Sequence, residues 1–256
     1  MAPLANVSRT RQDMTSLTIP GAERLIVALD LPTVDAALRV VEKLDNVSFF
    51  KVGLQLFLTG GLPTLLQSLR AKRVFVDLKV PGDISNTIGA VIDLCIEHGV
   101  TFLTLSESMP PAAIRAAAAA RNAHDRAEPK LLTVPFLSSL DADDLAETIG
   151  AGDDLETHVL RRAKSALDAG CDGVIASGPA IQWCRTAFPL PTLIVSPGIR
   201  PGGATTDDHK RHTTPAEAIR FGADYLVVGR PILRSADPRA AAERVIREIE
   251  DRKSVV

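Results

Sequence analysis

Eight short apolar runs, rich in β-branched residues, alternate along this chain with eight stretches that have the pattern of helices. The runs cover residues 25–30, 48–53, 74–79, 101–105, 130–136, 173–177, 192–196 and 225–229. The helical stretches cover residues 34–44, 62–69, 86–98, 112–121, 158–169, 180–186, 215–221 and 239–252. Apolar strands that alternate with helices are typical of a parallel sheet covered by helices. Eight such units predict an α/β fold of the (β/α)8 TIM-barrel class.

The domain organisation follows from where these units begin and end. We expect a flexible N-terminal tail over residues 1–20 and a single barrel domain over residues 21–256. The tail holds Arg9 and Arg11 with only one acid, Asp13, a bias also seen in transit peptides, but it lacks an amphipathic pattern and a secretory core. A doubly wound open sheet is the alternative fold. In such folds a GxGxxG sequence often follows the first strand, and no such sequence follows the first predicted strand here, which argues against this alternative.

The charge and cysteine content limit the kinds of binding partner and cellular compartment that we expect for this chain. The chain has 29 Lys and Arg against 31 Asp and Glu, a formal charge of −2, with no basic block. This balance predicts no nucleic-acid partner and no anionic membrane partner, and no apolar run approaches the roughly 18 residues of a membrane span. Cys95, Cys171 and Cys184 stand singly, as buried thiols do in a reducing compartment. We therefore expect a cytoplasmic protein.

Charged residues end the first three predicted strands. These residues are Asp30, Lys51, Asp77 and Lys79. Active sites of such barrels lie at the carboxyl ends of the strands, and strand alternation predicts that Asp77 and Lys79 point to the same face. A strand-end salt bridge without chemistry is the alternative for this pair. Lys51 favours an acid–base network, because so many charges in one place are a costly way to stabilise a fold.

Residues at the other strand ends suggest an anion site. Ser138, Arg200, Gly229 and Arg230 follow predicted strands, and Arg230 precedes a proline suited to the first turn of a helix. Backbone N–H groups with a guanidinium favour an anion, and barrels often bind phosphate after strands 7 and 8. Arg230 as an ordinary surface cation is the alternative. The glycine-containing stretch 196–209 is predicted to be a long loop of the kind that forms lids.

A series of sequence blocks, in order, resembles the orotidine 5′-phosphate decarboxylase family over residues 23–250. The blocks are LIVALD, FFKVGLQLF, VFVDLK with a following Asp and Asn-Thr, SPGIRP, and TPAEAIRFGADYLVVGRPI. The resemblance implies a (β/α)8 barrel and decarboxylation of orotidine 5′-phosphate to UMP in pyrimidine synthesis, without a cofactor or a metal. It also implies a homodimer whose active sites lie at the subunit interface.

The resemblance also implies residue roles. Lys79 is expected to be the proton donor, within a catalytic network of Lys51, Asp77 and Asp83 in which Asp83 reaches across from the partner subunit. The expected substrate-binding residues are Asp30, Lys51, Asn86, Thr87, Ser138, Arg200, His209, Gly229 and Arg230. Among these, Asp30 and Lys51 are expected at the ribose, Ser138 near the pyrimidine, and Arg200, Gly229 and Arg230 at the phosphate.

Two departures from the family pattern bear on these roles. The usual D-x-K-x-x-D spacing is one residue longer here, and we interpret Pro81-Gly82 as a loop insertion that lets Asp83 keep its place. His209 stands where the family usually has Gln; a histidine can still donate to phosphate, and a solvated loop histidine is the alternative.

Two alternative functions remain. Magnesium-dependent sugar-phosphate decarboxylases and hexulose-phosphate synthases share the D-x-K-x-x-D motif, but they place Glu at the end of the second strand, where this chain has Lys51. A non-catalytic, nucleotide-binding barrel is suggested by the Asp83 spacing and by His209. The presence of Lys51, Asp77 and Lys79 together argues for catalysis.

Overall fold

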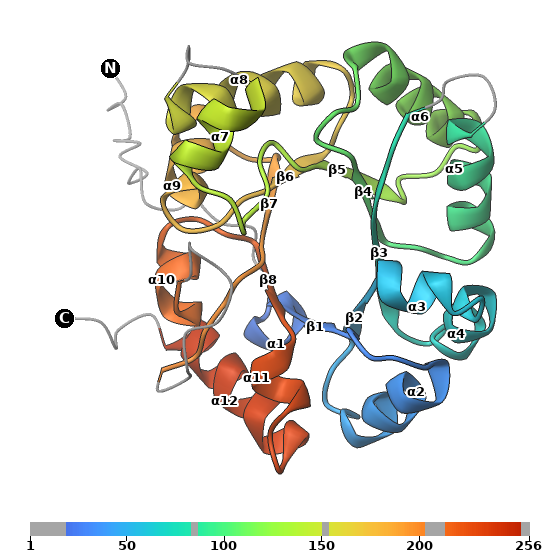
Figure 1. Cartoon of the computed structure of the whole chain (residues 1–256). Coiled ribbons are helices and arrows are strands. Elements are labelled where there is room, and N and C mark those ends of the chain that lie inside the picture. The colour runs from blue at the N-terminus through green and yellow to red at the C-terminus, as the bar shows by residue number, and fades with distance from the viewer. Residues whose placement is uncertain (1–18, 83–86, 150–153, 203–212, 252–256) are drawn as a thin grey trace, which may run out of the picture.

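Eight parallel strands form a closed barrel surrounded by helices (Figure 1). The computed structural model describes residues 19–82, 87–149, 154–202 and 213–251. The strands pair in chain order and β8 closes against β1. They are β1 (Leu25–Ala28), β2 (Phe49–Gly53), β3 (Arg73–Val80), β4 (Phe102–Leu105), β5 (Lys130–Thr133), β6 (Gly173–Ile175), β7 (Leu193–Ser196) and β8 (Tyr225–Val228). The barrel class and the eight strands predicted from the sequence are therefore confirmed.

The helices lie outside the ring of strands. They are α1 (Gly21–Arg24), α2 (Val34–Lys43), α3 (Leu54–Leu58), α4 (Leu62–Ser68), α5 (Ile88–Glu97), α6 (Pro111–Ala123), α7 (Ala142–Ile149), α8 (Leu155–Asp168), α9 (Pro179–Ala187), α10 (Pro215–Arg220), α11 (Arg230–Leu233) and α12 (Pro238–Glu250). The sequence prediction omits α1, α3, α7 and α11. Helix α3 follows β2 without a polar or turn-forming boundary beyond Gly53, so periodicity does not separate the two elements. Within the described part of the chain, no helix is both long and apolar enough to cross a bilayer.

Local sequence rules explain several helix boundaries. The side chains of Thr33, Asp154 and Asp237 each accept a hydrogen bond from a backbone N–H in the first turn of α2, α8 and α12. Gly170 and Gly222 follow α8 and α10 with φ of 111° and 105°, a region that favours glycine. Each glycine ends its helix three positions before the next strand, β6 or β8, begins.

Side chains alternate between the barrel interior and the layer under the helices. Ile26 points inward and Leu25 and Val27 point outward, so that two separate apolar clusters form. The interior cluster is aromatic: the Phe49 and Phe102 ring centroids are 5.0 Å apart, and the guanidinium of Arg73 lies 4.4 Å above the Phe49 ring. These groups fill the amino-terminal half of the barrel, and the opposite end is left to form a site.

Candidate active site

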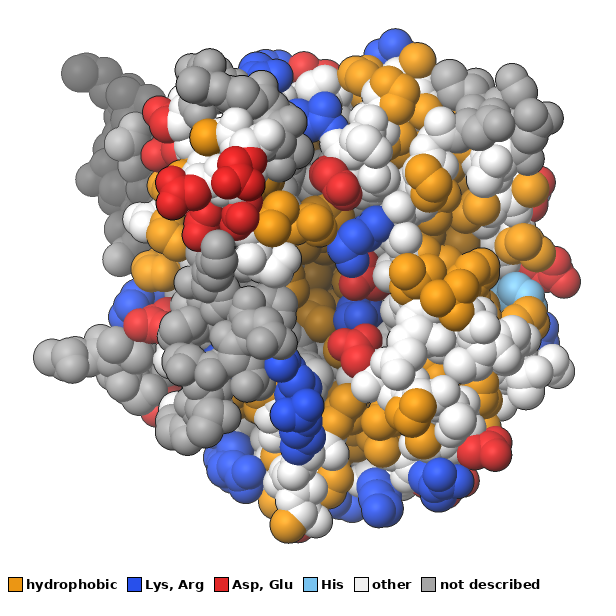
Figure 2. All heavy atoms as spheres, in the orientation of Figure 1, with side chains coloured by type: hydrophobic (Ala, Val, Ile, Leu, Met, Phe, Trp, Pro, Cys, Tyr) orange, Lys and Arg blue, Asp and Glu red, His pale blue; other side chains and the backbone are white. Residues whose placement is uncertain are grey.

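A cavity of about 220 Å³ opens at the carboxyl ends of the strands. The sequence-predicted residues in its wall are Asp30, Lys51, Asp77, Lys79, Ser138, Arg200, Gly229 and Arg230. Figure 2 shows a hollow near the centre of this face, in which acidic and basic side chains alternate. A closed parallel barrel brings all the strand ends to one rim, so residues up to 200 positions apart become neighbours.

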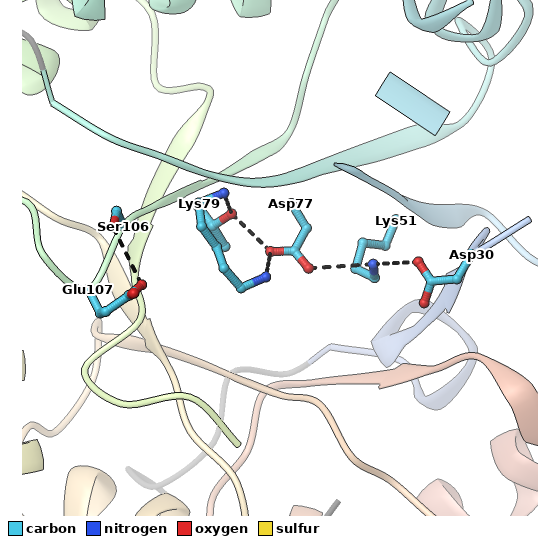
Figure 3. Close-up of polar contacts among 7 residues, drawn as sticks. Asp30, Lys51, Asp77, Lys79, Ser106 and Glu107 are labelled. Carbon is cyan, nitrogen blue, oxygen red and sulfur yellow. Dashed lines mark hydrogen bonds and ion pairs between the residues drawn. The ribbon is translucent and has the colours of Figure 1, made fainter. Parts of the chain in front are cut away.

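Four charged side chains form a continuous row along one wall (Figure 3). The Lys51 Nζ atom lies 2.9 Å from Asp30 Oδ1 and 3.4 Å from Asp77 Oδ2. The other Asp77 oxygen, Oδ1, accepts a hydrogen bond of 2.9 Å from Lys79 Nζ. Lys51 and Asp77 are the two inner members of the row. Each therefore lies between two groups whose charge is opposite to its own, and these groups hold it in place from both sides.

Burial and charge act in opposite directions on the two central groups. Burial by itself would lower the pKa of Lys51, but the Asp77 and Asp30 carboxylates outweigh it and raise that pKa above its usual value. Burial would likewise raise the pKa of Asp77, but the Lys51 and Lys79 ammonium groups and two hydrogen bonds lower it. Lys51 is therefore a fixed cation and Asp77 a fixed anion at neutral pH.

Asp77 and Lys79 lie in an irregular part of β3. Val76 pairs with Leu103 and Val80 with Leu105, so four steps along β3 match only two along β4. Lys79 has φ of 50°, which a residue with a side chain rarely adopts. Asp77 and Lys79 do lie on the same side, as predicted, but a bulge in the strand and not regular alternation places them there.

Thr104 on β4 is a site residue that the sequence analysis missed. Its hydroxyl donates a hydrogen bond of 2.9 Å to Asp77 Oδ1 and accepts one of 3.0 Å from the Lys79 backbone N–H. Nothing in the local sequence marks it, because threonine is an ordinary strand residue. Its contacts depend on how β3 and β4 pair.

The part of the wall that follows β7 and β8 carries the predicted anion-binding residues. Gly229 follows β8, and Arg230 begins α11. Arg200 follows β7, is buried, and donates a hydrogen bond of 3.0 Å from Nη1 to the Ile199 carbonyl. A Cβ atom built on Gly229 would lie 3.7 Å from Asp30 Oδ2, so the end of β8 also lies beside the row of charges.

The remaining wall is mostly apolar and was not selected from the sequence. It comprises Ala28, Phe75, Val134, Leu137, Ile175, Pro197, Gly198 and Val227. Inward-facing positions near strand ends could have indicated several of these residues. The cavity therefore combines an apolar floor, one wall of alternating charges and a second wall with two arginines. A ligand that carries polar groups and an anionic group fits this combination.

Four expected site residues are not part of this described wall. Thr87 is the residue that precedes α5 and lies outside the cavity wall as described. Asp83, Asn86 and His209 fall outside the described residues. Among the residues that are described, no group of three or more His, Cys, Asp or Glu side chains is arranged to hold a metal ion.

The sequence model of the orotidine 5′-phosphate decarboxylase / HUMPS family matches residues 23–245. A protein of Methylococcus capsulatus named orotidine 5′-phosphate decarboxylase is 44% identical over 244 residues, 93% of this chain and 96% of the relative. A protein of Rhodopseudomonas palustris with the same name is 44% identical over 229 residues, 89% of this chain and 94% of the relative.

Solved structures show the same likeness. The crystal structure of orotidine 5′-phosphate decarboxylase from Lactobacillus acidophilus superimposes with a TM-score of 0.74 and 32% sequence identity. The superposition covers 89% of this chain and 99% of that one. Sequence and fold therefore agree over nearly the whole length of the described barrel.

Proposed function

Because the chain belongs to the orotidine 5′-phosphate decarboxylase / HUMPS family, we propose that it converts orotidine 5′-phosphate to UMP and CO2 in pyrimidine biosynthesis. The observation that carries the proposal is the Lys79–Asp77–Lys51–Asp30 row of alternating charges at the cavity wall. A cation held beside a carboxylate is the arrangement that this decarboxylation requires.

The chemistry assigned to Lys79 follows from the reaction. The bond between C6 and its carboxylate breaks, CO2 leaves, and the electron pair stays on C6 as a carbanion that the ring delocalises poorly. A preorganised ammonium group stabilises this charge and then transfers a proton to C6. Lys79, the more exposed lysine of the row, regains its proton from water. Asp77 holds the ammonium group through its Oδ1 atom.

The other residues are assigned to binding the substrate. Asp30 and Lys51 bind ribose hydroxyls, Ser138 lies near the pyrimidine, and Arg200, Gly229 and Arg230 bind the phosphate. The phosphate is remote from C6, so its binding energy serves to order the site. The resemblance alone supports the further roles of Asp83, Asn86, Thr87 and His209 at the same site.

We further propose that the enzyme is a cytoplasmic homodimer with shared sites. An apolar patch on α3 and α5 supports the dimer: Leu54, Phe57, Leu58 and Leu94 are 53%, 46%, 73% and 55% exposed. Figure 2 shows apolar side chains gathered beside the charged hollow. Such a surface is typical of a protein interface. Asp83 lies in the sequence between β3 and α5.

A subunit-mixing experiment tests the shared site. Lys79→Ala and Asp83→Ala subunits are each expected to be inactive. If Asp83 crosses a two-fold interface, random exchange makes half of the dimers mixed, and each mixed dimer has one intact site. Activity should then rise to about a quarter of the wild-type value. Activity that stays at the level of the parent variants would assign Asp83 to its own subunit's site.

The decarboxylation itself is tested by following the absorbance of orotidine 5′-phosphate after adding purified protein, with and without EDTA. We expect loss of the substrate spectrum that EDTA does not change. An unchanged spectrum would contradict the proposed function. Activity that EDTA abolishes would favour the magnesium-dependent relatives, which the Lys51 ammonium group between two carboxylates argues against.

The role of Lys79 is tested with a matched lysine. Lys79→Ala should lower kcat by a factor of about 10² or more, as expected for a lost proton donor. Lys164→Ala removes an exposed lysine of α8 that pairs with Asp168 and should leave kcat unchanged. A Lys79→Ala enzyme with more than about a tenth of the wild-type kcat would show that another group donates the proton.

A further inference from the structure

The irregular pairing between β3 and β4 places the reactive lysine, and one hydroxyl group holds that irregular segment. Between the pairs Val76–Leu103 and Val80–Leu105, β3 has two more residues than β4. The Lys79 N–H inside this bulge donates to Thr104 Oγ1 at 3.0 Å. A side chain of the neighbouring strand therefore holds the backbone at this point.

The directions of the hydrogen bonds at Thr104 are fixed by chemistry. The lowered pKa of Asp77 keeps its carboxylate ionised, so its oxygens only accept. Thr104 must therefore donate to Asp77 Oδ1, at 2.9 Å, and use a lone pair to accept from Lys79 N–H. Both bonds are formed at once by a residue that is completely buried.

The same Asp77 oxygen also accepts from the Lys79 ammonium group at 2.9 Å. Thr104 thus contacts Lys79 at both ends: directly at its backbone N–H, and through Asp77 at its Nζ atom. The backbone of Lys79 has φ of 50°, which is unfavourable for a residue with a side chain. A hydrogen bond that holds this conformation also sets where the lysine side chain leaves the strand.

We propose that Thr104 is a positioning residue, whose hydroxyl group holds the Lys79 backbone in its left-handed conformation and aims the Asp77 carboxylate at the Lys79 ammonium group. This inference rests on the proposed function, because its consequence is measured as turnover. It predicts that the hydroxyl group matters to the chemical step and not to the affinity for the nucleotide, since Thr104 is not part of the described cavity wall.

Two substitutions separate the hydroxyl group from the shape of the side chain. Thr104→Val keeps the branched shape and removes both hydrogen bonds, whereas Thr104→Ser keeps the hydroxyl group. We expect Thr104→Val to lower kcat by about tenfold to a hundredfold, the range that a misplaced catalytic group produces. KM for orotidine 5′-phosphate and the Kd for UMP should change by less than about threefold, and Thr104→Ser should keep most of the wild-type kcat.

The control is Thr133→Val on the neighbouring strand β5. Thr133 is buried as well, and the alternation of Leu131 and Leu132 between the two apolar clusters places it on the outer face. Thr133→Val is expected to keep wild-type kcat. An unchanged kcat in Thr104→Val overturns the proposal. If Thr104→Val does not fold, Thr104→Ser decides: a folded serine variant with a kcat as low as that of Lys79→Ala also overturns it.

Amide hydrogen exchange distinguishes failure of this inference from failure of the proposed function, because it needs no substrate. The Lys79 amide should exchange at least about tenfold faster in Thr104→Val than in the wild type or in Thr133→Val. Equal exchange rates in folded protein overturn the positioning role. Faster exchange in a protein whose wild type does not consume orotidine 5′-phosphate contradicts the proposed reaction and leaves the hydroxyl group's structural role intact.

Discussion

The guanidinium group of Arg185 on α9 forms an ion pair of 2.7 Å with the carboxylate of Asp224, the residue that precedes β8. The same carboxylate oxygen accepts a hydrogen bond of 2.8 Å from the Ile194 backbone N–H at the start of β7. An equivalent arrangement joins Arg121 on α6 to Asp172, which precedes β6. Both ion pairs lie at the amino-terminal end of the strands, opposite the active site, where they tie a helix to two strands.

Arg185→Ala should therefore lower the free energy of unfolding strongly without changing the chemistry. Asp224 is 2% exposed. Burial raises the pKa of its carboxyl group more than Arg185 lowers it, so an ionised Asp224 without Arg185 would destabilise the folded state. Breaking a buried pair of this kind costs about 3–5 kcal/mol. Urea unfolding at neutral pH measures the loss, and kcat of the folded variant should equal that of the wild type.

Arg239→Ala is the matched control for that substitution. Arg239 pairs with Asp45 at 2.8 Å, but both side chains are more than half exposed. An exposed pair contributes at most about 1 kcal/mol. If Arg185→Ala and Arg239→Ala lose equal amounts of unfolding free energy, burial does not determine how much the Arg185–Asp224 pair stabilises the protein.

Arg230→Ala should affect only the substrate that carries a phosphate. We expect a large loss of kcat/KM with orotidine 5′-phosphate and almost no change in the slow turnover of orotidine, because the role proposed for Arg230 is to bind the phosphate. Steady-state kinetics with the two substrates measures the difference. Equal losses on both substrates would assign Arg230 a structural role at the start of α11.

The lowered pKa of Asp77 predicts how stability depends on pH. The unfolded chain binds a proton at Asp77 near its ordinary value of 3.8, and the folded chain does so only at lower pH. The stability that ionised Asp77 supplies is thus fully present above that value and is lost as pH falls through the folded pKa. Urea unfolding of the wild type and of Asp77→Asn at about pH 5 and about pH 3 measures it. The wild type should lose more unfolding free energy between these two conditions than the variant; a constant difference would contradict the ion-pair account.

The three cysteines should be unreactive in the folded protein. Cys95, Cys171 and Cys184 are buried free thiols, and burial raises the pKa of each to about 12. The thiolate, which is the reactive form, is therefore scarce at about pH 8. Ellman's reagent should titrate no thiol in the native protein and three after denaturation. A thiol that reacts rapidly in the native state would contradict the buried positions.

The sequence by itself determined the barrel and most of the charged site. Each strand is a short apolar run that is followed by a helix, so local periodicity identifies the strand–helix units. The presence of eight such units indicates that the sheet closes into a barrel. Because all strand ends of a parallel barrel lie at one rim, the charges of Asp30, Lys51, Asp77 and Lys79 can be brought together from their positions alone. Helix α3 escaped prediction because its apolar sequence continues that of β2.

Only the tertiary structure decided which of these residues touch and what holds them. The bulge in β3 and the φ of Lys79 arise from its pairing with β4, and the role of Thr104 follows from that pairing. Arg185 and Asp224 are 39 residues apart, and each has an ordinary local sequence. Patterns of hydrophobicity specify which face of an element is buried. They do not specify the register between neighbouring elements or the individual hydrogen bonds that the register creates.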